Sequence, residues 1–116
     1  LYTHPWRNMI KTLDFSIITG FEWDKGNNQK SVLKHSVKNN ECEEVFFNDP
    51  VFLPDRTHSQ VEKRYHAFGV TNKKRFLLVS FTLRGEEKQI IRVISARDQS
   101  KKEKAYYGTQ KGDEEK

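Results

Sequence analysis

The sequence predicts a small α+β domain built on an antiparallel sheet. Apolar residues alternate with a period of two along several segments in the second half of the chain, and short turns separate these segments. Parallel neighbours would need crossovers of a dozen or more residues, so antiparallel pairing is expected. The 116 residues leave room for one ordinary domain. With two helical patterns before these strands and one after them, the expected order is βααββββα.

The first half of the chain predicts one strand and two helices. Residues 15–23 are rich in β-branched and aromatic side chains, which indicates a strand, and Asp24 can cap the structure that follows. Residues 27–35 and 40–47 are typical of short helices. Asn48-Asp49-Pro50 ends the second helix, because proline cannot continue it.

The second half predicts the remaining strands and a closing helix. Residues 51–53 form a short edge strand ahead of a proline, and residues 63–70 alternate in the manner of a third strand. The clearest strand covers 75–83, whose first half is apolar on both faces, so it should be central in the sheet. A tight turn leads to a strand at 89–95, and a helix at 100–107 closes the domain.

The ends of the chain are assigned separately from the domain. Met9 begins a run that resembles a normal start, so residues 1–8 are expected to be upstream or cloning-derived sequence. Residues 111–116 are expected to form a flexible charged tail. The single domain is therefore expected to span residues 9–110.

Charge and cysteine content restrict the class of protein. The formal net charge is +5 with a pI near 9.4, which favours a polyanionic partner such as RNA, DNA or an acidic inhibitor surface, although net charge also serves solubility. Cys42 is the single cysteine and excludes an intrachain disulfide. No apolar run is long enough to cross a bilayer and no signal segment is evident, so a cytoplasmic protein without membrane contact is expected.

Two arginines near the last predicted strand are the first candidates for function. Arg92 lies in that strand and Arg97 lies where the strand runs into the closing helix. Arginine is planar, permanently charged and shaped to bind two oxygens, so this pair suits a phosphate group. The alternative for Arg97 is an ion pair with Glu103 that ties the strand to the helix. Arg92 has a similar ambiguity, because a place at the rim of the sheet with a buried stem is compatible with either role.

Several short motifs follow one another between Phe21 and Tyr107. They are Phe-Glu-Trp-Asp at 21–24, Lys34-His35, Val45-Phe46-Phe47-Asn48-Asp49-Pro50, His58-Ser59 with Glu62 and Arg64, and Ile91-Arg92-Val93-Ile94-Ser95-Ala96-Arg97 followed by Glu103 and Tyr107. With these motifs the chain resembles the BrnT family of toxins from type II toxin–antitoxin systems. The resemblance implies a RelE-like ribonuclease fold and RNA cleavage that arrests translation. It also implies neutralisation by a BrnA-like antitoxin with a DNA-binding part, and a toxin pair bound by two antitoxins in a hetero-tetramer.

The first helix departs from the family pattern. That pattern reads Lys, then Asn, then Lys-His-Gly, whereas this chain has Asn27, Ser31 and Lys34-His35-Ser36. If the missing lysine normally meets phosphate, RNA cleavage is weakened here unless Lys25 or Lys30 reaches the same place through its flexible stem. Whether catalysis survives these changes is left open by the sequence.

RNA carries its own nucleophile, the 2′-hydroxyl beside the scissile phosphate, so cleavage requires no metal or other cofactor. The protein must align that oxygen, accept its proton, stabilise the phosphorane-like transition state and protonate the leaving 5′-oxygen. The hypothesis assigns phosphate stabilisation to Arg92, Arg97 and Arg64, backbone-phosphate contact to Lys34, and acid/base catalysis to His35. The alternative for His35 is an ordinary residue at a helix C-terminus, where the dipole favours it.

Three further residues are assigned to nucleic-acid binding, each beside a structural alternative. His58 and Glu62 can form an acid/base pair, or belong to an ordinary turn before a strand. Tyr107 can stack on a base, or pack the last helix on the sheet. The spacing of histidines and cysteine predicts no metal site. Two other functions remain alternatives to the ribonuclease: a non-enzymatic nucleic-acid-binding domain, and a degenerate toxin that only binds its antitoxin.

Overall fold

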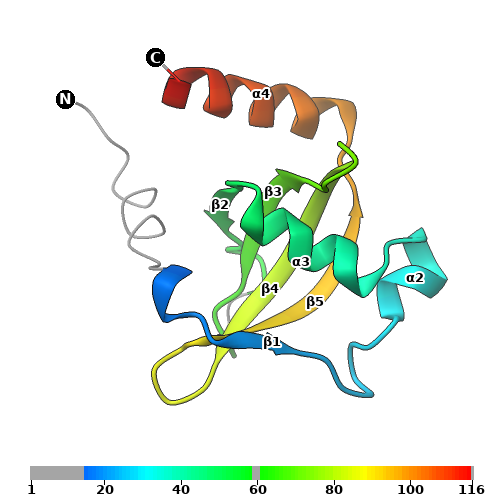
Figure 1. Cartoon of the computed structure of the whole chain (residues 1–116), viewed down its shortest axis with the longest axis vertical. Coiled ribbons are helices and arrows are strands. Elements are labelled where there is room, and N and C mark those ends of the chain that lie inside the picture. Colours follow the sequence, from blue (N-terminus) through cyan, green and yellow to red (C-terminus); the bar gives the residue numbers. More distant parts are fainter. Residues whose placement is uncertain (1–14, 59–60, 116) are drawn as a thin grey trace.

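The computed structural model describes residues 15–58 and 61–115 as one sheet with helices against it (Figure 1). The predicted order βααββββα and the α+β class are confirmed, with a short 3-10 turn added in front. In chain order the elements are η1 (Phe15–Ile17), β1 (Gly20–Glu22), α2 (Lys30–His35), α3 (Asn39–Phe47), β2 (Val51–Pro54), β3 (Tyr65–Val70), β4 (Phe76–Arg84), β5 (Ile90–Asp98) and α4 (Lys101–Glu115).

The sheet is mixed rather than wholly antiparallel. Its strand order is β1-β5-β4-β3-β2, and β2 to β5 form antiparallel pairs as predicted. β1 differs, because it pairs with β5 in parallel. Short turns require antiparallel pairing only between strands that follow one another. β1 and β5 are separated by two helices and three strands, so that constraint does not apply to them.

Several element boundaries differ from the prediction. α2 begins at Lys30 instead of residue 27 and β5 ends at Asp98 instead of residue 95, and two elements differ more. The first strand covers Gly20–Glu22 instead of residues 15–23, because β5 begins opposite Gly20 and offers no strand beside the earlier residues. The last helix continues to Glu115, so residues 111–115, predicted as tail, are helical, and Lys111 Nζ bonds Asp49. Residues 1–8 lie outside the described part of the chain.

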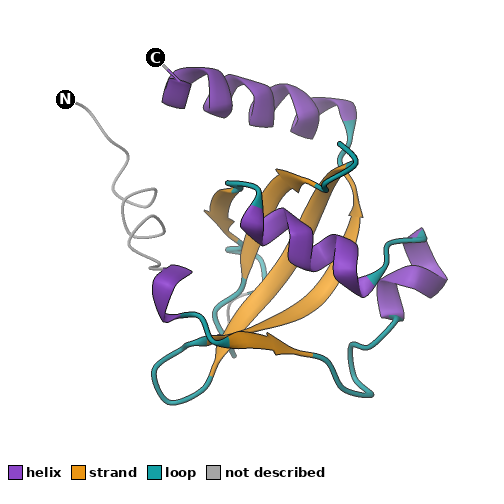
Figure 2. Ribbon diagram, viewed as in Figure 1, coloured by secondary structure: helices purple, strands orange, loops and turns teal. Residues whose placement is uncertain are grey.

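The main core lies between one face of the sheet and α3, which crosses that face in Figure 2. Phe46 of α3 packs edge-on against Phe81 of β4 with ring centroids 4.9 Å apart. Leu77 and Val79 share the face of Phe81, as the alternation predicts, and are 0% exposed. Burying each such side chain contributes roughly 1.5–3 kcal/mol, which fixes the register of β4 in the sheet.

The opposite face of the sheet is only partly covered. Tyr107 of α4 is 6% exposed and packs with Phe76, and its neighbour Tyr106 packs against Phe68 of β3. Beyond this smaller core the same face continues with polar residues, including His66 of β3 and Ser80 of β4, which are partly exposed. α4 therefore covers only part of this face, and a polar site can form on the rest.

A bulge in β5 determines which arginines reach that face. The register between β4 and β5 shifts at Ser80 and Phe81, which leaves Ile94 as an extra residue in β5. In a regular strand, residues five apart point to opposite faces. With the bulge, Arg92 and Arg97 both lie on the polar face, and neither enters the core under α3.

Candidate active site

A cavity of about 390 Å³ opens on the polar face, where β3, β4 and β5 meet α2 and the β2–β3 connection. Its basic side chains are Lys30, Lys34, Arg64 and Arg97. Its other titratable side chains are His35, His58, His66 and Asp55. We call this cavity the His66 pocket. Four permanently basic groups against one carboxylate in its lining make the pocket a place where an anion is favoured.

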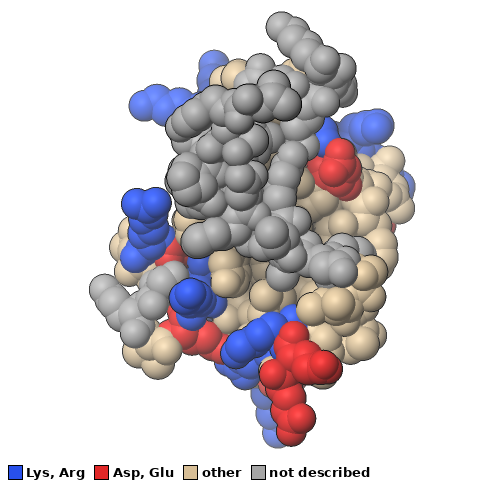
Figure 3. All heavy atoms as spheres, turned by 90° about the vertical axis from the view of Figure 1, so that its left-hand side faces the viewer, with Lys and Arg blue, Asp and Glu red and all other residues tan. Residues whose placement is uncertain are grey.

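The group of cations in the pocket has to be compared with the distribution of charge on the rest of the surface. On the side shown in Figure 3, basic and acidic side chains are interspersed and lie against one another. A net charge of +5 therefore does not by itself identify an anion-binding surface. The local excess of cations in the pocket is the more informative observation.

Asp55 links two of the histidines. Its side chain is 8% exposed, and its Oδ2 lies 3.0 Å from Nδ1 of His58 and 3.6 Å from Nε2 of His66. Burial alone would raise the pKa of Asp55, but the hydrogen bond from His58 and the nearby charges of both histidines lower it overall. Asp55 is therefore a carboxylate at neutral pH, and its charge favours the protonated form of the His66 ring.

His66 is held on its other side by β4. Its Nδ1 lies 2.9 Å from Oγ of Ser80, and its side chain is 26% exposed. Burial lowers the pKa of His66, and the attraction of Asp55 opposes that change without reversing it. The ring is thus mostly neutral at pH 7, where it can accept a proton.

The Arg97 side chain forms an ion pair with the first turn of α4. Its Nη1 and Nη2 donate to the two carboxylate oxygens of Glu103 at 2.8 and 2.9 Å, so the predicted ion pair is present. Glu103 also accepts from the backbone N–H of Ser100, and its own N–H donates to Ser100 Oγ, which completes a capping box. These bonds, led by that from Arg97, lower the pKa of Glu103 to about 2. Arg97 therefore enters the pocket from a fixed strand–helix junction.

The short helix α2 brings Lys34 and His35 to the pocket. Arg75 fixes the end of that helix, because its Nη2 and Nη1 donate to the carbonyl oxygens of His35 and Ser36 at 3.3 and 2.9 Å. The same guanidinium donates from Nε to Asp98 at 2.7 Å, which anchors it to the end of β5. Lys34 and His35 are themselves exposed, as groups that meet a large substrate must be.

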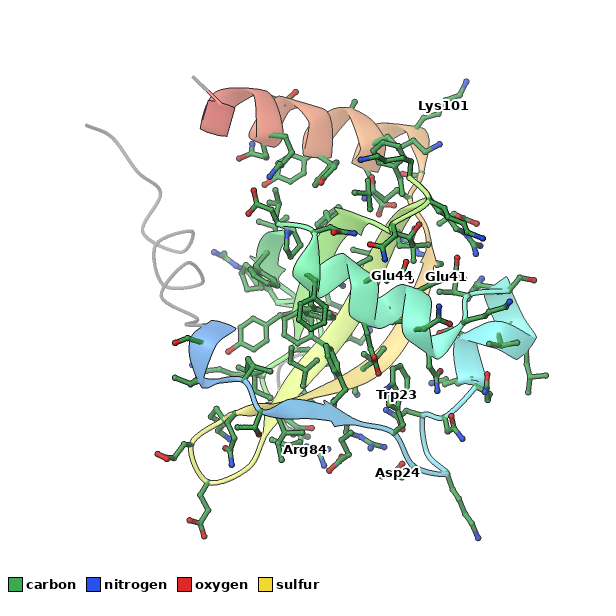
Figure 4. All side chains as sticks on the ribbon, viewed as in Figure 1. Trp23, Asp24, Glu41, Glu44, Arg84 and Lys101 are labelled. Atoms are coloured by element: carbon green, nitrogen blue, oxygen red, sulfur yellow. The ribbon has the colours of Figure 1, made fainter. Side chains whose placement is uncertain are left out.

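Arg92 and Glu62, which the sequence also proposed for the site, belong to a separate ion-pair network. Arg92 donates from Nη1 to Glu22 and Asp24 at 2.8 Å each, and Arg84 donates to Glu62 at 2.6 Å. We call these five residues the carboxylate end. Asp24 and Arg84 lie at the other end of the molecule from Lys101, which begins α4 (Figure 4). The bond from Arg92 lowers the pKa of Asp24, so this end carries three carboxylates and two arginines.

Tyr107, the remaining predicted residue, is in neither place. It is buried between α4 and the sheet, where it packs with Val51, Phe68 and Leu78. Of the eight predicted residues, the structure therefore brings five to the pocket: Lys34, His35, His58, Arg64 and Arg97.

The two departures in the first helix occupy structural positions. The Asn27 amide donates to the carbonyl oxygens of Glu22 and Val93 at 2.8 Å each, which ties the connection after β1 to β5. Ser31 Oγ accepts the backbone N–H of Ala96 at 2.8 Å and holds α2 against β5. Lys30, next to Ser31, lines the pocket, so a lysine from this segment is present there.

Sequence reasoning missed Asp55 and His66. The signal for His66 was available, because alternation along residues 63–70 places it on the same side as Arg64. Asp55 had no such signal, since it follows a proline in a connection whose path the sequence does not define. A buried carboxylate is recognised only once its two histidine neighbours are placed around it.

Three further findings apply to the part of the chain that the structure describes. There, no set of three or more histidine, cysteine or acidic side chains is arranged to hold a metal ion. Cys42 is buried against the sheet, and burial raises the pKa of its thiol to about 12. Among the described helices, none has both the length and the apolar content needed to cross a membrane.

A comparison with known protein families assigns the chain. The model for "Ribonuclease toxin, BrnT, of type II toxin-antitoxin system" matches residues 23–103, which cover β2 to β5, α2, α3 and the start of α4. A search of individual curated proteins gives no match. The matched range contains every residue of the His66 pocket.

Proposed function

The chain belongs to the BrnT family of ribonuclease toxins of type II toxin–antitoxin systems, and we propose that the His66 pocket is its active site. Membership of the family makes RNA its substrate and an antitoxin its partner. The observation that supports the location is the convergence of Lys34, His35, His58, Arg64 and Arg97 on one cavity. Lys34 and His35 come from α2, His58 and Arg64 from the β2–β3 connection, and Arg97 from β5. The fold therefore assembles the cavity from distant segments.

The proposed reaction is transesterification within the RNA. The 2′-oxygen loses its proton and attacks the adjacent phosphorus, and the bond from phosphorus to the 5′-oxygen breaks. The products are a 2′,3′-cyclic phosphate and a 5′-hydroxyl, with one proton accepted and one donated by the protein. Because the nucleophile belongs to the substrate, we propose that cleavage needs no metal ion.

The pocket supplies the groups this reaction needs. Arg97 and Arg64 are proposed to neutralise the charge that develops on the phosphate oxygens, for which a positioned donor contributes roughly 3–4 kcal/mol. Arg97 lines the cavity, and its two bonds to Glu103 fix the plane of its guanidinium. Lys34 is proposed to contact a neighbouring phosphate, and His35 and His58 to act as acid/base groups. We do not extend these roles to Arg92, Glu62 or Tyr107, whose side chains are engaged elsewhere.

The partners and consequences of this activity follow from its class. We propose that cleavage arrests translation in the cytoplasm until a BrnA-like antitoxin binds, and that the resting complex contains two toxins and two antitoxins. Co-expression with the product of the adjacent reading frame tests the partner. A co-purifying complex whose mass corresponds to two of each chain is expected, and a monomeric toxin with no bound neighbour would contradict this proposal.

The reaction is tested by incubating the purified protein with a defined RNA in EDTA and analysing the ends of the products. The expected result is a 2′,3′-cyclic phosphate, produced by the wild type and lost in Arg97→Ala. Intact RNA at high enzyme concentration would instead favour a degenerate toxin or a binding module. Cleavage that appears only when a divalent ion is restored would overturn the metal-free mechanism and leave the class intact.

A further inference from the structure

His66 is a titratable group inside the pocket that the roles above do not use. It lies on β3, a strand paired on both sides, whereas His58 lies in a connection and His35 ends a six-residue helix. Its ring is fixed by Ser80 on one side and by Asp55 on the other. Groups that transfer protons in a reaction must be held within a few tenths of an ångström, which a paired strand does better than a loop.

We propose that His66 is the catalytic base that accepts the proton of the attacking 2′-hydroxyl, with Ser80 and Asp55 as positioning residues. The proposal rests on the proposed function, since it requires RNA cleavage in this pocket. The proposal assigns to the neutral ring the tautomer in which Nδ1–H donates to Ser80 Oγ at 2.9 Å and Nε2 carries the free lone pair. Nε2 is then the nitrogen that receives the substrate proton.

Asp55 completes the arrangement once the proton has moved. The 2′-oxygen transfers its proton to Nε2 while its electron pair forms the bond to phosphorus, and the ring becomes an imidazolium. Asp55 Oδ2 lies 3.6 Å from Nε2, near enough to stabilise that positive charge. The proton for the departing 5′-oxygen comes from a second group, for which His35 and the 61% exposed His58 line the same pocket.

The electrostatic surroundings keep the base in its active form. Burial and the positive charges of Arg97 and His58 disfavour protonation of His66, and Asp55 and Glu103 favour it. The balance lowers the pKa of His66 below its ordinary value near 6.5. Across the cavity, three cations from α2 and the end of the β2–β3 connection act in the same sense: Lys30, Lys34 and Arg64. His35 also lines that side. Neutral imidazole therefore predominates at pH 7.

The test is single-turnover cleavage of a defined RNA in EDTA between roughly pH 5 and 9. The variants are His66→Gln and Ser80→Ala, with Thr109→Ala as a control that removes a hydroxyl from the exposed side of α4. His66→Gln is expected to slow cleavage roughly hundred- to ten-thousandfold and to abolish the rise in rate with pH, with RNA affinity changed less than about twofold. Ser80→Ala is expected to shift the midpoint of that rise, and Thr109→Ala to leave rate and midpoint unchanged.

A second measurement uses the wild type alone and so does not depend on a variant that folds. The ring carbon-bound proton of His66, identified by sequential NMR assignment, is titrated against pH. Its midpoint is expected below 6.5 and equal to the kinetic midpoint. Different midpoints, or a variant that retains the wild-type rate and profile, would overturn the role of His66 and leave the proposed function standing. A wild type that cleaves no RNA would overturn both.

Discussion

The His66 pocket and the carboxylate end lie on the same polar face of the sheet, and both contain paired arginines, yet their electrostatics are opposite. In the carboxylate end, Glu22, Asp24 and Glu62 surround two arginines. In the lining of the pocket, two arginines and two lysines face one carboxylate, Asp55. An arginine pair in a sequence therefore does not by itself locate an anion site. The acidic residues that the fold brings to each pair decide it.

The difference has a physical basis in the hydrogen bonds of each guanidinium. Arg92 makes three bonds of 2.8–3.0 Å to two carboxylates, so an incoming phosphate would have to displace both. Arg97 is bound by one carboxylate, on the edge next to α4. The bidentate bond to that carboxylate, with the bond from Nη1 to the Asp98 carbonyl oxygen at 3.1 Å, orients the planar group, and Arg97 also lines the cavity. The first arginine is a structural cation and the second is suited to a substrate.

The largest expected contrast is in the rate of cleavage. Arg97→Ala should lower the single-turnover rate by roughly 100- to 1,000-fold, because it removes a positive group from the developing charge on the phosphate. Arg92→Ala should change the rate per folded molecule by less than about threefold. Parallel assays at one temperature, corrected for the folded fraction by circular dichroism, make the comparison. Equal losses in the two variants would mean that the two ends are not functionally distinct.

RNA affinity should give a smaller contrast between two lysines. Lys34 lines the pocket, whereas Lys25 is exposed near Asp24 at the carboxylate end. Lys34→Ala should weaken binding of a non-cleavable RNA analogue about three- to tenfold and reduce the slope of log affinity against log salt by about one. Lys25→Ala is the matched control, with little change in either quantity. Fluorescence-anisotropy titrations measure both variants. A larger effect of Lys25→Ala than of Lys34→Ala would place the RNA at the carboxylate end and contradict this prediction.

Thermal stability should depend more on Arg92 than on Arg97, which is the reverse of their effects on the cleavage rate. Arg92 links β1 to the connection before α2, and its side chain is 14% exposed, so Arg92→Ala should lower the melting temperature by roughly 4–8 °C. Arg97→Ala should lower it less, because Ser100 still caps α4 through the capping box with Glu103. Differential scanning calorimetry measures both. A more destabilised Arg97→Ala would indicate that the Arg97–Glu103 pair is mainly structural.

A final prediction concerns the acid dependence of stability through Glu103. Its pKa is lowered from 4.5 to about 2 in the folded state, so its contribution is complete above pH 4.5 and is lost as pH falls toward 2. Glu103→Gln should therefore reduce stability at pH 6 and flatten its decline between pH 4.5 and 2. Urea unfolding at several pH values tests this. An unchanged acid slope would show that Glu103 is not coupled to Arg97 in solution.

Much of the fold was predictable because it follows local pattern. Alternation identified β4 as central and assigned Leu77, Val79 and Phe81 to one face, all of which are buried under α3. Two features were not predictable from local pattern. The parallel pairing of β1 with β5 joins segments 70 residues apart, and the bulge at Ile94 changes which side chains share a face. Both depend on the balance of packing over the whole sheet.

The residues of the site were predictable where the type of side chain by itself indicates a chemical role. Basic and histidine side chains with motif spacing led to Lys34, His35, His58, Arg64 and Arg97, which lie together. The same reasoning selected Arg92, because the sequence does not show that Glu22 is its register partner in a parallel pair. Asp55 escaped notice for a related reason. Counter-charges from distant segments decide these assignments, and they appear only in three dimensions.

RNA should bind the His66 pocket and not the carboxylate end, and an NMR titration distinguishes the two places. An RNA with a 2′-deoxy nucleotide at the scissile position cannot be cleaved by the proposed route, so it can be titrated into isotope-labelled protein and followed by NMR. The account predicts chemical-shift changes concentrated at His35, His58, His66 and the Arg97 side chain. Changes concentrated instead at Arg84 and Arg92, with the pocket signals unmoved, would contradict it.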